Sequence, residues 1–406
     1  MTKLARQDDE ARALVRLGFD ELHGFTRSIG TMEREIAARA FGYVPAGKPI
    51  RLVHDTVATS VVGALGGATA ALGRGAEAVV ARRPPPQRPL SATVPGGLGL
   101  AALNGLVGDR LERERSPLQE PISIRVDGLP VALERDALAR AYPDAAPRLA
   151  IFVHGLMGNE VGWRLGRRQG REPYGTRLAA ELGCTPVYVR YNSGRHISEN
   201  GRSLAEALEA LVAAWPVEVT EVALVGHSMG GLVARSACHR AAKDEAAWVQ
   251  RVRHVVSLGS PHLGAPLEQA AHVASYAANL LPETRMFSTF LRRRSSGIRD
   301  LRQGSLVDED WRDRDPEALR AAACEEVPLL EGATHCFVSA TVTRSPRHPV
   351  GRVVGDTLVL QSSATGRSRT RKLGFEDEYG LHIGATNHIA LLNHPAVYEK
   401  LREWLG

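Results

Sequence analysis

The stretch Val222–Ala237, which reads VALVGHSMGGLVARSA, decides the fold class of this 406-residue chain. It begins with a short apolar run, which is typical of a buried strand, and its second half has the composition of a helix. Gly226, Ser228 and Gly230 lie at the junction. A serine between glycines at this point fits the pattern G-x-S-x-G, in which a sharp strand-to-helix turn exposes the hydroxyl above a sheet.

The segments on either side continue the alternation of strands and helices. Strand-like runs occur at 148–155, 185–193, 252–261 and 334–342, and segments with helical spacing follow most of them. This order predicts an α/β fold with a mostly parallel sheet and helices on both faces. Residues 122–133 predict a short antiparallel pair before it. Active residues of such sheets lie in the loops at the carboxyl ends of the strands.

Ser228 is the candidate nucleophile of this turn. To attack an acyl carbon it needs a base, a carboxylate that orients the base, and donors for the oxyanion. The amide of Met229 directly follows the serine, and the amide of Leu156 lies in the loop after an earlier strand, so we predict these two as the oxyanion hole. His154 precedes the serine in the chain, so we expect its ring to pack or to form hydrogen bonds instead.

Four segments resemble the α/β-hydrolase superfamily in its bacterial lipase and esterase branch. They are VHGLMGN (153–159), VGHSMGGLVAR (225–235), SLGSPHLGAP (257–266) and NHIALLNHPAVYEKLREWL (387–405). They occur in the order of that family, and the resemblance covers residues 121–406. The serine segment followed by GSPHLGAP also resembles hydrolases similar to the GPI inositol-deacylases. The resemblance implies the α/β-hydrolase fold with a helical cap insert.

The resemblance also implies the catalytic base. In the family a histidine follows the last strand and precedes the closing helix, and His388 occupies that position here. His382 lies within the strand-like segment LHIGA, and His394 lies directly before Pro395 at the start of the helix. We expect a capping or surface role for His394.

The acid implied by the resemblance is Asp356, within VVGDTLVLQSSATG. This segment keeps the Ser-Ser-Ala tail of the family pattern. It departs from the pattern at Thr357 and Leu360, where the family usually has glycine and proline. We expect Asp308 and Asp310, the other acidic candidates, to be solvated or structural.

The function implied by the triad Ser228, Asp356 and His388 is a serine esterase or lipase. Such an enzyme cleaves carboxylic esters with an apolar acyl group through an acyl-enzyme, and its substrate is a small-molecule or lipid ester. No metal or organic cofactor is expected. Two alternatives stay open: an acyltransferase that uses the same triad, and a non-catalytic scaffold on a hydrolase fold. The intact triad argues against the scaffold.

Composition divides the chain into an Ala/Gly-rich helical extension (1–118) and the hydrolase domain (119–406), whose cap insert spans about 267–332. Leu, Met and Phe cluster at 280–291 and would either face an acyl chain or pack an ordinary core. Thr56–Gly73 is uncharged but rich in small residues. We expect a helix packed on another helix, with peripheral membrane contact or a membrane span as the alternatives.

Composition also bears on partners and location. The formal net charge is +6, and no block of basic residues is interleaved with aromatic ones, so we expect no nucleic-acid partner. The four cysteines form no CxxC pair and no zinc spacing, and we expect free, buried thiols. The N-terminal segment has no apolar core of a secretory signal, which predicts a cytoplasmic protein, with membrane association through the extension as an alternative. Self-association into a homo-oligomer is a further expectation left open.

Overall fold

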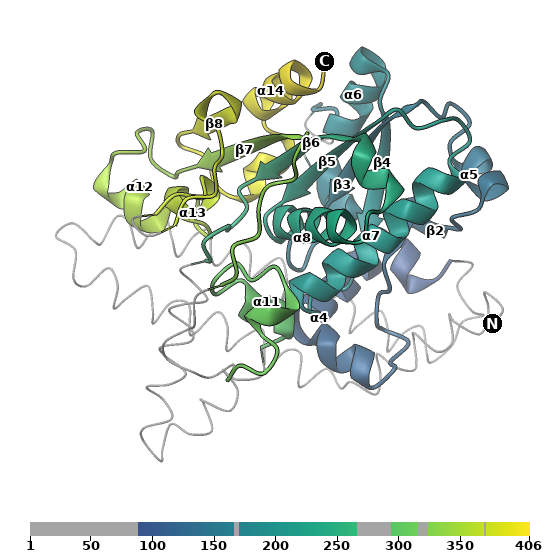
Figure 1. Ribbon diagram of the computed structural model, residues 1–406, viewed down its shortest axis with the longest axis horizontal. Coiled ribbons are helices and arrows are strands. Elements are labelled where there is room, and N and C mark those ends of the chain that lie inside the picture. The colour runs from purple at the N-terminus through teal and green to yellow at the C-terminus, as the bar shows by residue number, and fades with distance from the viewer. Residues whose placement is uncertain (1–87, 166–169, 266–293, 316–323, 369–370) are drawn as a thin grey trace.

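An eight-stranded sheet forms the centre of the computed structural model, with strand order β2-β1-β4-β3-β5-β6-β7-β8 (Figure 1). The structure describes residues 88–165, 170–265, 294–315, 324–368 and 371–406. The strands are β1 (Ser123–Val126), β2 (Leu129–Val131), β3 (Arg148–Val153), β4 (Thr185–Arg190), β5 (Glu221–His227), β6 (Val252–Leu258), β7 (Thr334–Ala340) and β8 (Gly380–Ile383).

The pairing of the strands confirms the predicted fold class. β1 pairs with β2 and with β4 in antiparallel fashion, and all other neighbouring strands of the sheet are parallel to each other. The central strands β3 and β5 are apolar except at their ends, because helices cover both faces of such a sheet. The order of the strands along the sheet does not follow from the sequence pattern.

Helices α7 and α8 cover one face of the sheet, and α6 and α14 cover the other. Ile151 and Val153 of β3 belong to one core cluster with α7 and α8, while Ala150 and Phe152 belong to a second cluster with α6 and α14. Successive residues of a strand point to opposite faces, so a single strand contributes to both cores. The helices that flank the sheet are α5 (Arg135–Ala141), α6 (Tyr174–Leu182), α7 (Ile197–Ala214), α8 (Met229–Lys243) and α14 (Pro395–Leu405).

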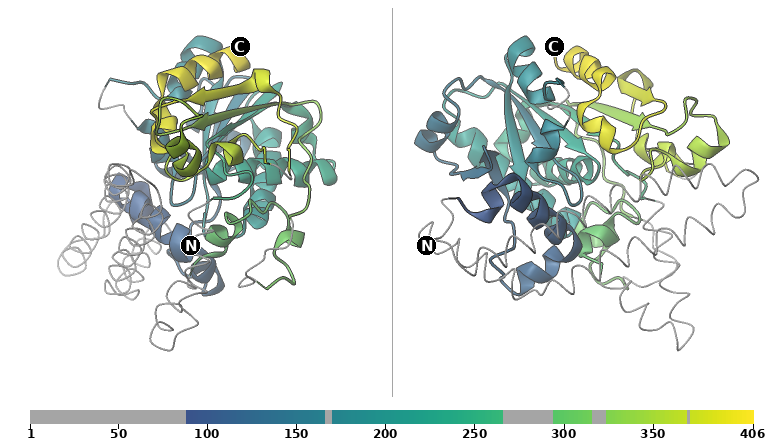
Figure 2. Two further views of the ribbon diagram at one scale, coloured as in Figure 1. Left: turned by 90° about the vertical axis from the view of Figure 1, so that its left-hand side faces the viewer. Right: turned by 180° about the vertical axis from the view of Figure 1, so that it is seen from behind.

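Further helices lie at the ends of the strands. Before the sheet comes α4 (Val94–Arg113), which contacts α11 (Ser296–Asp300) although the two are far apart in the sequence (Figure 2). The remaining short helices are α12 (Pro349–Val354) and α13 (Gln361–Ala364). The predicted apolar cluster of the cap at 280–291 and the segment Thr56–Gly73 lie outside the described residues.

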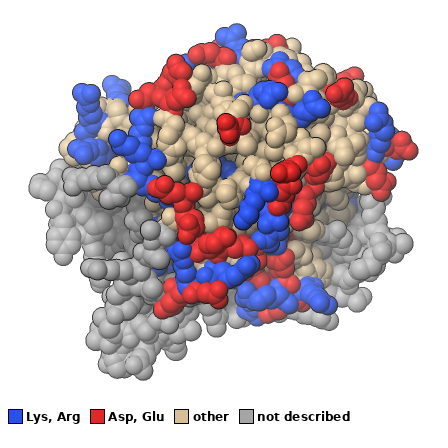
Figure 3. All heavy atoms as spheres, in the orientation of Figure 1, with Lys and Arg blue, Asp and Glu red and all other residues tan. Residues whose placement is uncertain are grey.

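Surface charges alternate in sign on the face shown in Figure 3, where Lys and Arg side chains lie among Asp and Glu. The net positive charge is therefore not gathered into one patch on this face. Within the described ranges no helix is both long and apolar enough to cross a membrane. All four cysteines are free, as predicted, and three of them are buried.

Candidate active site

Ser228 occupies a sharp turn between β5 and α8. Its backbone angles are φ 55° and ψ −126°, in the region that glycine favours and other residues rarely adopt. The Ser228 amide donates to the carbonyl of Leu258 at the end of β6, at 2.9 Å. The side chain does not cap α8. The turn thus holds the serine at the carboxyl edge of the sheet, where the sequence predicts it.

The glycines around Ser228 allow the backbone to pass within contact distance. A Cβ atom on Gly230 would lie 2.2 Å from the carbonyl oxygen of Val153, and one on Gly226 would lie 2.4 Å from the amide nitrogen of Gly231. Both distances are too short for any side chain. The glycine spacing of the motif therefore reflects the contact of α8 with the ends of β3 and β5.

His388 and Asp356 form a buried pair. The Nδ1 atom of His388 lies 2.7 Å from Oδ2 of Asp356, and the two side chains are 2% and 1% exposed. The other carboxylate oxygen, Oδ1, accepts the amides of Leu358 and Val359 at 3.0 and 2.8 Å. The amide of His388 donates to the carbonyl of Asp356 at 2.8 Å. These bonds fix the carboxylate so that it orients the imidazole.

The His388 ring lies beside the strand ends that carry Ser228. A Cβ on Gly259 would lie 3.2 Å from both Nδ1 and Cε1 of His388, and Gly259 directly follows the residue that binds the Ser228 amide. The ring of His227 lies 4.7 Å from that of His388, centroid to centroid. Within the described residues, Nε2 of His388 is buried without a hydrogen-bond partner. This nitrogen is the one that would receive a proton from a nucleophile.

The two predicted oxyanion donors flank the serine. Met229 begins α8, so its amide is one of those at a helix N-terminus that have no partner within the helix. Leu156 follows Gly155, on which a Cβ would lie 2.9 Å from Cβ of Ser228. Neither amide donates to an acceptor in the described part of the chain. Both are therefore available for an oxyanion beside Ser228.

Two buried histidines next to the site are held neutral. Burial lowers the pKa of His154 to about 4, and burial together with the neighbouring His388 lowers the pKa of His227 to about 3. The His154 ring stacks on Tyr191 at 4.2 Å, and its Nε2 accepts the Tyr191 amide at 3.2 Å. This confirms the packing and hydrogen-bonding role that we expect for His154.

The other histidines considered for the base lie in structural positions. Nδ1 of His394 accepts the amide of Ala396 at the start of α14, at 3.2 Å, which confirms the expected capping role. Nδ1 of His382 lies 3.0 Å from the Ser339 hydroxyl, and its Nε2 lies 3.2 Å from that of Thr341. Among the predicted base candidates, only His388 pairs with a carboxylate.

Asp308 and Asp310 are structural, as expected. Asp308 accepts hydrogen bonds from the Ser198 hydroxyl at 2.6 Å and from Arg202 at 2.7 Å. Asp310 accepts the amides of Leu306 and Glu325 at 2.8 and 2.7 Å. Both carboxylates hold the chain between α11 and β7.

Sequence reasoning missed two serines that support the site loops. The Ser193 hydroxyl accepts the amide of Met157, directly after Leu156, at 3.0 Å. The Ser363 hydroxyl donates to the carbonyl of Gly264 at 2.7 Å, which ties the loop after β6 to the helix that follows Asp356. Ser363 belongs to the Ser-Ser-Ala tail, which is the one signal that singles it out in the sequence.

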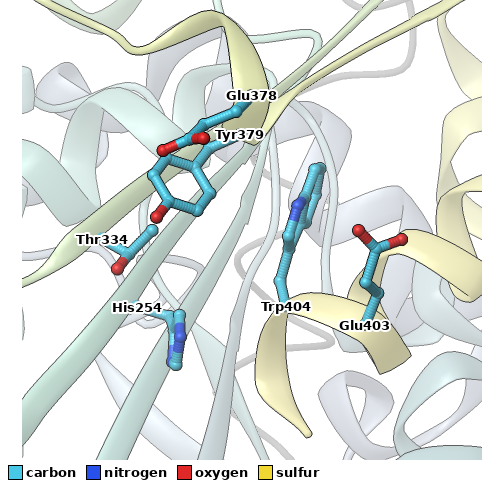
Figure 4. A pocket seen from close by; sticks show the side chains of 6 residues that line it. All are labelled: His254, Thr334, Glu378, Tyr379, Glu403 and Trp404. Atoms are coloured by element: carbon cyan, nitrogen blue, oxygen red, sulfur yellow. The ribbon is translucent and has the colours of Figure 1, made fainter.

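A cavity of about 370 Å³ lies elsewhere, at the amino ends of the strands (Figure 4). His254 and Thr334 are register partners near the starts of β6 and β7, whereas Ser228 follows the end of β5. This cavity is therefore separate from the candidate active site. Its lining residues are His254, Thr334, Glu378, Tyr379, Glu403 and Trp404. The described residues contain no cluster of side chains arranged to hold a metal ion.

Comparison with protein families gives one match. Residues 144–300 match the family described as "Putative serine esterase (DUF676)". The match contains Ser228 and Leu156 and ends before Asp356 and His388. No curated protein matches the chain.

Solved structures with a similar fold are bacterial and archaeal lipases and esterases. The mature lipase BlEst2 of Bacillus licheniformis is 18% identical over 65% of this chain and 93% of its own, with a TM-score of 0.41. The Staphylococcus hyicus lipase is 14% identical over 64% and 92%, with a TM-score of 0.36. The Pyrococcus furiosus esterase PF2001 is 14% identical over 65% and 84%, with a TM-score of 0.34. These likenesses are too distant to carry an argument about the site.

The family match confirms the resemblance stated from the serine motif and its neighbouring segments. It supports ester hydrolysis in general terms. The likeness to GPI inositol-deacylases stays a prediction.

Proposed function

We propose that the chain is a serine hydrolase that cleaves carboxylic esters through an acyl-enzyme, since residues 144–300 match a serine esterase family and the serine motif lies on a mostly parallel sheet. The observation that carries the proposal is the buried His388–Asp356 pair beside the strained Ser228 turn. A turn of this kind costs about 1–3 kcal/mol and persists only where the surrounding structure enforces it.

In this mechanism Ser228 Oγ attacks the ester carbonyl carbon while Nε2 of His388 takes the hydroxyl proton. The tetrahedral intermediate collapses, the bond to the leaving oxygen breaks, and His388 gives its proton to the departing alcohol. Water then attacks the acyl-enzyme with His388 as base, and the carboxylic acid leaves. Asp356 keeps the proton of His388 on Nδ1, so that Nε2 is free to accept one.

The amides of Leu156 and Met229 bind the oxyanion of each intermediate. Met229 also lies at the N-terminus of α8, where the helix dipole favours negative charge. One donor of this kind contributes about 10²- to 10³-fold to kcat. The apolar acyl group of the substrate remains a prediction from the cap sequence at 280–291, which lies outside the described residues.

The test combines covalent labelling with a substrate series. A fluorophosphonate probe should label Ser228, and esters graded by acyl length should be hydrolysed. Ser228→Ala should abolish both, with a loss of several orders of magnitude in rate. Ser203→Ala is the matched control, because Ser203 lies on α7 and binds Arg195. Labelling at another residue, or hydrolysis that survives Ser228→Ala, would contradict the proposal.

A further inference from the structure

The loop that carries Leu156, residues 155–160, is held at three points by elements that come from distant parts of the sequence. The first point is Gly155, which lies against the serine turn: a Cβ there would lie 2.9 Å from Cβ of Ser228 and 3.2 Å from the carbonyl of His227. The Leu156 amide directly follows this contact. Its position therefore depends on what holds the next residue.

The second point is Met157. Its φ of 57° lies in the left-handed region, and its amide donates to the buried hydroxyl of Ser193 at 3.0 Å. Gly105 of α4 also lies against Met157. A Cβ on Gly105 would lie 2.4 Å from Cγ of Met157 and 3.0 Å from its Cα and N. The backbone of α4 thus contacts Met157, the residue after Leu156, directly.

Helix α4 also packs against the loop after β4, and this loop contains Ser193. The side-chain amide of Asn192 donates to the carbonyl of Gly108 at 2.9 Å, and a Cβ on Gly108 would lie 1.8 Å from Oδ1 of Asn192. A Cβ on Gly194 would lie 2.1 Å from the carbonyl of Asn104. Glycines on both elements therefore permit a contact between backbones that larger residues would prevent.

The third point is Glu160, at the far end of the loop. Arg190 at the end of β4 binds Glu160 through two nitrogens, and its Nη1 donates to Glu120 at 2.9 Å and to the carbonyl of Ser91 at 2.6 Å. Arg190, Glu160 and Glu120 are 1%, 3% and 3% exposed. Glu120 follows α4 and Ser91 precedes it, so this buried ion cluster joins both ends of the helix to the loop.

We propose that α4 and Ser193 are positioning elements that set the Leu156 amide for the oxyanion. The proposal rests on the proposed function, because it gives a role to parts of the chain outside the triad. Leu156 lies between Gly155, which contacts the serine turn, and Met157, which contacts α4, so movement of Met157 moves the amide. A displacement of about 1 Å at a catalytic group can lower the rate about 10²-fold.

Two variants test this, one at each of these contacts of Met157. Ser193→Ala removes the acceptor of the Met157 amide, and Gly105→Ala pushes Met157 away from α4. We expect kcat to fall about 10-fold for Ser193→Ala and about 10- to 100-fold for Gly105→Ala, because an oxyanion donor is worth about 10²- to 10³-fold. KM should change less than twofold, since the oxyanion forms only after substrate binds.

Gly175→Ala is the control for general strain. A Cβ on Gly175 of α6 would lie 2.3 Å from the Tyr188 hydroxyl, a clash as close as that at Gly105 but remote from the loop. It should lower the unfolding temperature without changing kcat. A trifluoromethyl ketone, which forms an oxyanion on the serine, should bind the Ser193 and Gly105 variants more weakly in proportion to their loss of kcat.

The outcomes separate this inference from the proposed function. If wild-type protein hydrolyses esters and both variants keep its kcat and ketone affinity, the positioning role is wrong and the triad stands. If Gly175→Ala loses as much kcat as Gly105→Ala, the effect is one of stability and the inference is overturned. Wild-type protein without hydrolysis or Ser228 labelling would overturn the proposed function itself.

Discussion

Thr357 shows how a departure from a family pattern is accommodated at a single residue. The resemblance places glycine at this position, directly after Asp356, and the structure gives Thr357 a φ of 97°. A β-branched residue with such an angle is strained, because its Cβ crowds the backbone. The carboxylate of Asp356 nevertheless accepts the next two amides and meets His388. The turn after Asp356 thus keeps its hydrogen bonds although threonine replaces glycine at position 357.

Replacement of Thr357 by glycine should therefore stabilise the protein. We expect Thr357→Gly to raise the free energy of unfolding by about 1 kcal/mol, since a left-handed backbone costs other residues about 1–2 kcal/mol. Urea denaturation measures the change. Thr365→Gly is the matched control, because Thr365 has an ordinary helical backbone with φ −85°. There the substitution should destabilise by about 0.5–1 kcal/mol. An equal effect of the two would contradict the strain at Thr357.

The neutral side chain of His227, beside His388, makes stability depend on pH. His227 has a pKa of about 3 in the folded protein because it is buried beside His388, against about 6.5 in an unfolded chain. Between these values the unfolded state binds more protons. The free energy of unfolding therefore falls as the pH drops below about 6.5, by about 1.4 kcal/mol per unit for this group.

His227→Gln should remove this part of the pH dependence. Glutamine can still donate to the His388 carbonyl, which lies 3.1 Å from Nε2 of His227, but it does not titrate. The difference in unfolding free energy between the variant and wild type should shift in the variant's favour by about 3 kcal/mol between pH 7.5 and pH 4.5. Guanidinium titrations at both pH values measure it. An unchanged difference between variant and wild type would mean that His227 is not held neutral.

At the scale of elements, the sequence predicts best what depends on local pattern. The buried strands β3 and β5 are apolar except at their ends, and the helix after Ser228 must begin where the glycines allow the turn. These elements are found where they are predicted. Met229 and Leu156 follow from the same logic, because their positions are fixed relative to the strand ends.

Contacts between distant elements were harder to predict. The Asp356–His388 pair came from the resemblance, since no local pattern brings together residues on loops 32 positions apart. The contact of α4 with Met157 was missed altogether. Gly97, Ala101, Gly105 and Gly108 repeat at helical spacing, which indicates a face of small residues, but the pattern does not say what that face meets.

At the scale of the whole molecule, the described part of the predicted extension packs against the loops that follow β3 and β4. Leu100, Leu103 and Leu111 of α4 are buried in a cluster of their own with Leu118. The ion cluster of Arg190 includes the carbonyl of Ser91 and the carboxylate of Glu120, which lie on opposite sides of α4. The division of the chain at residue 118 stays a prediction, and the described contacts cross it.

Two truncations should therefore behave differently. A chain that begins at Arg88 keeps η1 (Leu90–Ala92), α4 and their contacts, whereas one that begins at Gln119 loses both helices and the contacts that they make. In the chain from Gln119, Met157 in the loop 155–160 loses its contact with α4, and Arg190 loses the Ser91 carbonyl as a hydrogen-bond acceptor. A buried group that loses its partner costs about 1–3 kcal/mol, and the exposed leucine face adds a tendency to aggregate.

We expect the chain from Gln119 to be recovered mainly as aggregate, and its soluble fraction to hydrolyse esters at least 10-fold more slowly than the chain from Arg88. Size-exclusion chromatography and active-site titration with the fluorophosphonate probe measure the two effects separately, because titration counts only folded sites. Equal solubility and equal turnover per labelled site in both chains would show that α4 is dispensable. Loss of turnover in both chains would instead mean that residues 1–87 are needed for hydrolysis.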